Sequence, residues 1–150
     1  MSDPFFSSMT LATSGMRAQK QRMDVVSENI ANASTTKAEN GQPYRRKMVV
    51  FGTEKLEKNF AEVFKSAGSS NADQLQSVVV RGVIKDKSEY RMVYEPSHPD
   101  ADKNGMVAYP NVNPTTEMMD FMAASRSFEA NTSVFEGSKR MFQKTMALMK

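Results

Sequence analysis

The sequence contains no cysteine, no tryptophan and a single histidine, His98. Without cysteine the chain can form no disulfide, thiolate metal site or cysteine nucleophile. One imidazole cannot supply a two-histidine metal site. The phosphate-binding loop G-x-x-x-x-G-K-[ST], the dinucleotide fingerprint G-x-G-x-x-G and the hydrolase motif G-x-S-x-G are also missing. We therefore expect no enzyme activity and no cofactor.

Long apolar runs are missing too. No stretch approaches the ~18 consecutive apolar residues of a membrane span. The start, MSDPFFSSMT, lacks the basic and apolar regions of a secretory signal. We expect no membrane insertion and no cleaved signal peptide, so any route out of the cytoplasm would need another export system.

Charge of one sign is not in excess, because the formal net charge is only +3. The one dense basic cluster is Arg45-Arg46-Lys47. It is accompanied by no recognised nucleic-acid-binding motif and no row of basic and aromatic residues. This favours a solvated strand or turn, and we expect no nucleic-acid partner.

Methionine is abundant, with 13 copies, and together with phenylalanine it marks two long amphipathic helices. Asp3-Pro4 and Asn113-Pro114 are typical helix starts. Beyond each start, mostly apolar residues recur with spacings of three and four, as in a coiled coil. The first seam runs through Phe5, Met9, Ala12, Met16, Gln19, Met23, Val26 and Ile30. The second runs through Met118, Phe121, Ser125, Phe128, Thr132, Phe135, Lys139, Phe142, Met146 and Met149.

The sequence predicts short strands in the middle of the chain. Val, Tyr and Phe dominate segments 44–51, 76–86, 89–94 and 105–110, between turn-forming residues. Segment 55–68 has helical spacing and predicts a short helix or a lid on the sheet, with a polar loop at 66–73. The sequence thus predicts an α+β protein. Residues 1–36 and 112–150 form a coiled-coil-like helical domain, and 37–111 form a central β-rich outer domain.

The first helix ends in SENIANASTT, residues 27–36, which is rich in residues that compete with a helical backbone for hydrogen bonds. We expect Asn29 and Asn32 to end the helix, because short polar side chains bond orphan backbone groups and tolerate left-handed backbone. An ordinary helix C-terminus makes the same local prediction.

Two candidate sites in segment 98–105 have simpler interpretations. Asp100, Asp102 and Asn104, followed by a glycine, match the opening of a calcium loop, but Asn111 stands where its bidentate acid belongs. We predict an Asn-Gly turn and no metal site. The alternative, a calcium-dependent binding module, requires binding at Asp100 and Asp102, which calorimetry would detect. His98 lies in a proline-rich loop and is interpreted as structural.

The apolar helix faces favour protein partners. The first helix carries Arg17, Lys20 and Arg22, whereas the second has acids on its polar side, and such mixed charge suits proteins more than anionic lipid. These acids are Glu117, Asp120, Glu129 and Glu136. Because both faces reach the chain ends, we interpret them as contacts to neighbouring copies. Pairing within one monomer and a free-standing helical-hairpin adaptor are the alternatives.

SENIANASTT at the end of a long N-terminal helix resembles the signature of flagellar rod, hook and hook-associated axial proteins. Three further segments are similar, more specifically, to proximal rod proteins of the bacterial flagellar basal body. These segments are GQPYRRK (41–47), VYEPSHPDADKNGMVAYPNVN (93–113) and EMMDFMAASRSFEANTSVFEGSKRM (117–141). Residues 52 to 76 match no pattern of this kind.

The resemblance implies a structural subunit exported by the flagellar type III system. It would assemble helically with copies of itself and other rod proteins on the export apparatus and membrane-ring base. The product is a drive shaft that crosses the periplasm and walls the export channel. Asn29 and Asn32 would then form the hinge between the helical tube and the outer domain. The residues expected at subunit interfaces are Met9, Met16, Met23, Val26, Ile30, Phe121, Phe128, Phe135 and Phe142.

Overall fold

The computed structural model describes residues 4–38, 41–55 and 76–148. Its helices are α1 (Pro4–Ala31) and α3 (Pro114–Leu148), and its strands are β1 (Lys47–Lys55), β2 (Gln76–Lys85), β3 (Arg91–Tyr94) and β4 (Met106–Tyr109). The predicted α+β class is confirmed. Except for the end of β1, the helix or lid expected at 55–68 and the loop expected at 66–73 lie outside the described residues.

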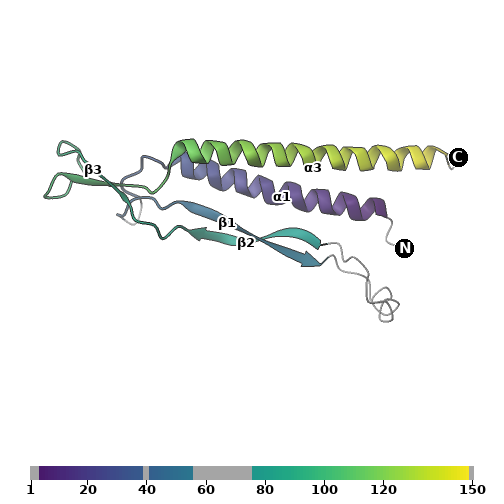
Figure 1. The fold of residues 1–150 in the computed structure, drawn as a ribbon, viewed down its shortest axis with the longest axis horizontal. Helices are drawn as coiled ribbons and strands as arrows, with labels where there is room; N and C mark the ends of the chain where they lie inside the picture. The colour runs from purple at the N-terminus through teal and green to yellow at the C-terminus, as the bar shows by residue number, and fades with distance from the viewer. Residues whose placement is uncertain (1–3, 39–40, 56–75, 149–150) are drawn as a thin grey trace.

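The two helices lie side by side in opposite directions, so that both ends of the chain are at one end of an elongated molecule (Figure 1). Each helix begins at the predicted proline, which has no N–H to leave unpaired. The side chain of Asn113 caps α3, because its Oδ1 accepts a hydrogen bond of 3.0 Å from the backbone N–H of Thr115.

The face of α3 that packs on α1 differs from the predicted seam. Met118 and Lys139 were placed in that seam, but Met118 is 58% exposed and Lys139 is also exposed. Ala124 and Ser138, one residue away from predicted positions, are 0% and 4% exposed instead. The buried or partly buried face runs through Ala124, Phe128, Asn131, Phe135, Ser138 and Phe142.

Small residues explain this difference, since they let the two helices approach closely. A Cβ added to Gly15 of α1 would lie only 2.8 Å from Nδ2 of Asn131 in α3. The hydroxyl oxygens of Ser8 and Ser138 are 3.1 Å apart and share a hydrogen bond. A pattern search based on large apolar residues overlooks such positions, although close packing selects them.

The strands form two separate two-stranded sheets. β1 and β2 make an antiparallel pair, with a register shift between Val50 and Phe51 that leaves Arg81 without a partner residue. This pair lies along α1, on the side away from α3 (Figure 1). β3 and β4 pair with each other at the end opposite the chain termini. The division into a helical and a separate β-rich domain stays a prediction.

Candidate functional site at the base of the helix pair

A polar cluster with a buried centre joins the last turns of α1, the start of β1 and the first turns of α3. We call it the polar junction. Its members are Glu28, Asn29, Tyr44, Arg46, Lys47 and Glu117.

Asn29 is the centre of the polar junction and is only 1% exposed. Its Oδ1 accepts hydrogen bonds of 2.9 Å from the backbone N–H of Lys47 and from the hydroxyl of Tyr44. Its Nδ2 donates to the backbone carbonyl of Lys47 and to Oε2 of Glu117, both at 2.9 Å. These four bonds use the whole capacity of the amide, so Asn29 fastens β1 and α3 to the end of α1.

Glu117 supplies the buried negative charge of the polar junction, from a side chain that is 1% exposed. Its Oε1 accepts from Nε of Arg46 at 2.6 Å, while Oε2 accepts from Asn29. Both oxygens are therefore occupied, which a buried carboxylate requires. The prediction that Glu117 lies on the solvent side of its helix is wrong. The hydrogen bonds from Arg46 and Asn29 offset the free-energy cost of removing its carboxylate from water.

The basic cluster is also not solvated as predicted, because each member has a partner. Besides binding Glu117, Arg46 places a guanidinium nitrogen 3.6 Å from Asp120, which in turn pairs with Arg22 at 2.7 Å. Lys47 pairs with Glu28.

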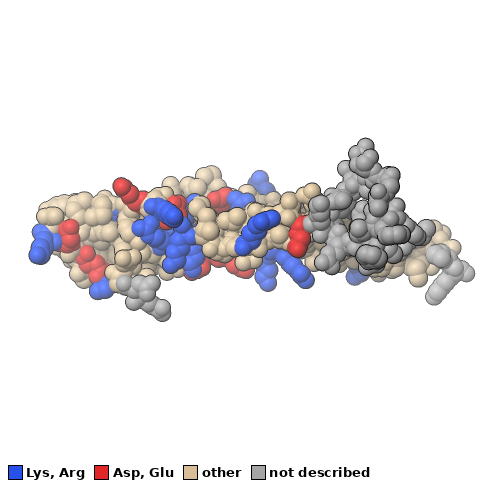
Figure 2. Space-filling model, turned by 90° about the horizontal axis from the view of Figure 1, so that it is seen from below, with Lys and Arg blue, Asp and Glu red and all other residues tan. Residues whose placement is uncertain are grey.

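Arg45 lies on the outer side of this cluster. Its guanidinium stacks 4.5 Å from the ring centre of Tyr90, and its Nε donates to the hydroxyl of Tyr90 at 3.0 Å. Figure 2 shows the molecule from the side of the β1–β2 pair. Basic side chains gather there at the end of the pair that lies farther from the chain termini. There Lys47 and Lys85 stand opposite each other in the strand register and, with Arg45, line a cavity of about 480 Å³. The cluster thus serves the structure of the chain itself.

Burial and the charges of the polar junction change the pKa of Tyr44. Burial is the main cause that raises the pKa of its hydroxyl to about 12, and the nearby carboxylates of Glu28 and Glu117 add to the effect. The neutral hydroxyl is thereby kept as the donor to Asn29.

We expect the raised pKa of Tyr44 to appear in an alkaline titration. Because the folded pKa lies above the unfolded value of 10.0, the stability that Tyr44 contributes is complete below pH 10 and is lost as the pH rises toward about 12. The hydrogen bond with Glu95 also raises the pKa of Tyr109, so ultraviolet absorbance of the four tyrosines should show a late phase that Tyr44→Phe reduces. Tyr90→Phe is the control, and loss of the late phase in that variant instead would contradict the assignment.

Asn32 has a more local role than Asn29. Its Nδ2 donates to the backbone carbonyl of Glu28 at 2.9 Å, and its Oδ1 accepts from the hydroxyl of Thr35 at 3.3 Å. The helix ends at Ala31, but no non-glycine residue in the described ranges adopts positive φ. The chain therefore turns away from α1 without left-handed backbone at either asparagine. Their role as a hinge stays a prediction.

The calcium-like segment forms a turn. The Oδ1 of Asp102 accepts from the backbone N–H groups of Asn104 at 2.7 Å and Met106 at 3.1 Å, and Gly105 has a φ of 77°. Asp100 accepts from the hydroxyl of Thr36 at 2.8 Å. Both carboxylates thus have protein partners. Among the described residues, no group of three or more His, Cys, Asp or Glu side chains could hold a metal ion.

His98 caps the same loop. Its Nδ1 accepts from the backbone N–H of Asp100 at 3.1 Å, and its ring lies edge-on to Tyr109, with centroids 6.3 Å apart. Both contacts fit a structural histidine.

Two of the residues expected at subunit interfaces, Met16 and Phe142, contact the other helix of the same chain. Thr132 places its hydroxyl 3.4 Å from the sulfur of Met16, and the rings of Phe6 and Phe142 meet edge-to-face at 5.7 Å. Val26 is 5% exposed and Phe121 is 37% exposed. The other predicted residues, Met9, Met23, Ile30, Phe128 and Phe135, are partly buried. The helices therefore pair within the monomer, and a role of these residues between copies stays a prediction.

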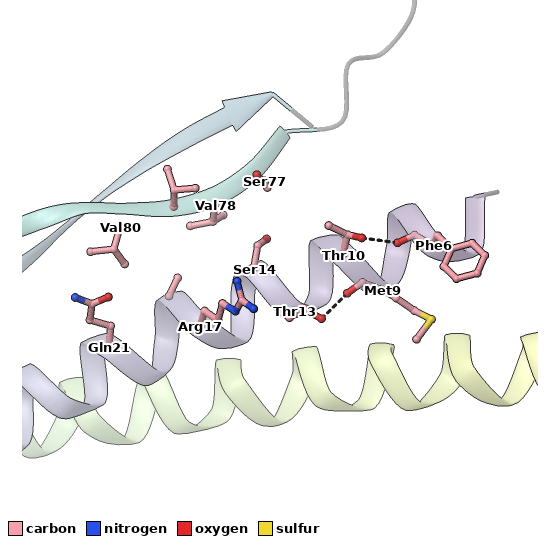
Figure 3. Close-up of a pocket in the computed structure, with 12 residues that line it drawn as sticks. Phe6, Met9, Thr10, Thr13, Ser14, Arg17, Gln21, Ser77, Val78 and Val80 are labelled. Carbon is pink, nitrogen blue, oxygen red and sulfur yellow. Dashed lines mark hydrogen bonds between the residues drawn. The ribbon is translucent and has the colours of Figure 1, made fainter. Parts of the chain in front are cut away.

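A cleft of about 580 Å³ separates α1 from β2. Figure 3 shows Val78 and Val80 facing Ser14 and Gln21 across it. The hydroxyls of Thr10 and Thr13, which also line it, bond to backbone carbonyls of their own helix. Among the described residues that line the cleft, Arg17 is the only ionisable one, so these residues offer no acid–base pair or nucleophile–base pair.

Two family models match the two helical ends of the chain. Residues 9–38 match the model described as flagella basal body rod protein, and residues 103–148 match the model described as flagellar basal body rod FlgEFG protein C-terminal. The first range contains Asn29 and the second contains Glu117. The helix pair is thus that of the flagellar rod class of protein.

Curated relatives cover nearly the whole chain. A flagellar basal-body rod protein FlgC of Borreliella burgdorferi is 40% identical, over 96% of this chain and 97% of the relative. Proteins of the same name from Bacillus subtilis and Agrobacterium fabrum are 38% and 36% identical, over 97% and 99% of this chain and 98% and 97% of those relatives. This chain belongs to the FlgC family of flagellar basal-body rod proteins.

Membership of this family makes the chain a structural protein and not an enzyme. Among the described residues, no helix is long and apolar enough to cross a membrane.

Proposed function

We propose that this structural rod subunit assembles helically with copies of itself and with other rod proteins. The assembly forms a drive shaft that crosses the periplasm, and it also forms the wall of the export channel. The subunit is delivered by the flagellar type III system without a cleaved signal, and it meets the export apparatus and membrane-ring base. The observation that carries the proposal is the paired α1 and α3, which bring both ends of the chain together at one end of the molecule.

The polar junction supports this proposal because it fixes the direction in which the strands leave the helix pair. Asn29 binds both backbone polar groups of Lys47, at the start of β1, and the carboxylate of Glu117 near the start of α3. A network whose members are all satisfied holds one geometry in every copy. A helical array requires such uniformity, since an error in one subunit repeats in all of them. In this role, Asn29 and Asn32 are the hinge between the tube and the outer strands.

The proposal is tested in cells whose own copy of the gene is deleted. We expect these cells to lack rods beyond the membrane ring and not to swim, and the wild-type chain to restore both. A map of purified basal bodies should then place α1 and α3 in the rod wall. Normal swimming of the deletion strain would contradict the proposal.

The helical-hairpin adaptor is the second candidate, and the pairing of α1 with α3 inside one chain favours it. It predicts a stable, strongly helical monomer that works without rod partners. Basal bodies that assemble normally but lack this chain would support the adaptor and contradict the rod subunit.

A further inference from the structure

The β1–β2 pair has one face that no described helix or strand covers. Among the described elements, α1 is the only one that packs on the pair. Val78 and Val80 point toward α1 (Figure 3). Because side chains alternate along a strand, Val79 lies on the other side, together with Gly52, its partner in the register. We call this side the outer face, and by the same register its other members are Met48, Val50, Glu54, Ser77, Gly82 and Ile84.

Two features of the strands hold Arg81 on the outer face. The register shifts between Val50 and Phe51 and leaves Arg81 as the extra residue of a bulge, and bulges redirect single side chains. The side chain of Arg81 crosses β1 at Gly52, where an added Cβ would lie only 2.1 Å from its Nε. Glycine weakens a strand, so the presence of Gly52 is explained by the position of Arg81.

The charge of Arg81 is not used within the described part of the chain. Arg81 is exposed and forms no ion pair with any described residue, Glu54 of the same face included, whereas Arg22 and Arg46 both bind carboxylates. A guanidinium presents a planar fork of donors that fits a carboxylate. The outer face therefore presents a carboxylate-binding group to which the described chain brings no carboxylate.

The residues around Arg81 are mostly apolar and leave room for a partner. Ile84 is 50% exposed, and three further apolar side chains of the outer face are partly buried, those of Met48, Val50 and Val79. Next to Arg81, Gly82 has nothing within 4 Å of the place that a Cβ would occupy. Arginine and methionine are enriched at protein interfaces, whose centres are apolar. This composition fits a protein segment in which a carboxylate is flanked by apolar side chains.

Charge favours a segment of a different protein over a second copy of this chain. The formal net charge of the chain is +3. Most of its described acids already have a hydrogen-bond or ion-pair partner in their own chain, namely Glu28, Asp86, Glu95, Asp100, Asp102, Glu117 and Asp120. A second copy thus has few free carboxylates to offer, and its net charge opposes the approach. An acidic segment of another protein is attracted instead.

We propose that the outer face is a docking surface for an acidic segment of a different protein, in which one carboxylate, flanked by apolar side chains, binds the guanidinium of Arg81. The apolar side chains of the segment cover Ile84 and the open space beside Gly82. The contact uses neither α1 nor α3, so it goes beyond the proposed assembly of rod subunits and does not rest on it.

Photo-cross-linking in cells tests the docking surface directly. Glu54 and Ile84, which are both exposed on the outer face, are replaced in turn by the photoreactive p-benzoylphenylalanine, and the adducts are identified by mass spectrometry. We expect one main adduct, with a different protein, and an Asp or Glu among apolar residues in the cross-linked segment. No adduct from either position, an adduct only with a second copy, or a segment without Asp or Glu would overturn the proposal.

Variants of Arg81 separate a binding role from a structural one. Arg81→Met keeps a long apolar side chain over Gly52 and removes the charge. We expect the amount of adduct to fall at least about tenfold, as when one partner of a close charge pair is lost. The melting temperature of the purified chain should change by less than about 2 °C. Lys87→Met removes an exposed charge just after β2 and is the matched control; equal loss of adduct in both variants would overturn the proposal.

Gly52→Ala tests the position of Arg81 without changing any charge. The new Cβ displaces the Arg81 side chain, so the amount of adduct should fall as it does in Arg81→Met. A normal amount of adduct in Gly52→Ala would show that the bulge and the glycine do not present Arg81 to a partner, and the proposal would be wrong.

A charge exchange with the partner completes the test. Replacing the acid of the cross-linked segment by lysine should abolish the adduct with the unchanged chain and restore it with Arg81→Glu. Failure of this exchange would overturn the carboxylate contact. None of these readouts uses swimming, so the two proposals fail separately. A deletion strain that swims, together with a normal adduct, would overturn the rod function only, whereas a missing adduct and a non-swimming deletion strain would overturn the docking surface only.

Discussion

Replacing Asn29 by alanine should destabilise the chain by about 3–4 kcal/mol, since several buried polar groups lose their partner at once. The groups affected are the backbone N–H and carbonyl of Lys47, the hydroxyl of Tyr44 and Oε2 of Glu117. Urea denaturation followed by circular dichroism measures the loss. In cells, we expect β1 and β2 to lose their fixed orientation relative to the helix pair, and we expect little or no swimming.

Asn32→Ala is the matched control, because it removes the same side chain three residues later. Its one bond to a backbone carbonyl, that of Glu28, is local and partly buried, so the expected loss is about 1 kcal/mol. If the two variants lose equal stability, the polar junction is not what holds the end of α1, and the two asparagines act only as an ordinary helix end.

Placing glutamate at Ala124 should separate the two helices. Ala124 is 0% exposed, so the larger side chain has no space and its carboxylate would enter a dry contact. We expect a loss of about 3 kcal/mol or more in urea denaturation, together with reduced helical signal. Swimming should be lost as well.

Ala130→Glu is the matched control on the same helix. Ala130 is exposed, so its glutamate stays in water and stability should change by less than about 0.5 kcal/mol. Equal destabilisation of both variants would show that the contact face of α3 is not the one described here.

The sequence alone determined the two long helices, their starting points and the α+β class. Prolines that follow Asp or Asn mark the helix starts, and Val-rich runs between turn residues mark the strands. These signals are local, because each depends on backbone preferences over a few residues. The resemblance of three segments and the SENIANASTT signature to flagellar axial proteins was sufficient for the family.

Only the tertiary structure decided which side chains meet. Asn29 and Glu117 are 88 residues apart, and no spacing rule connects them. Both are polar, so an apolar pattern assigns them to the surface, although mutual hydrogen bonds allow them to be buried. The seam of α3 was misplaced for a related reason. Gly15 and Ser138 are small and allow a close approach, and the side chain of Asn131 fills the space beside Gly15. Such packing depends on the shape of the opposite helix, which the sequence of one helix does not contain.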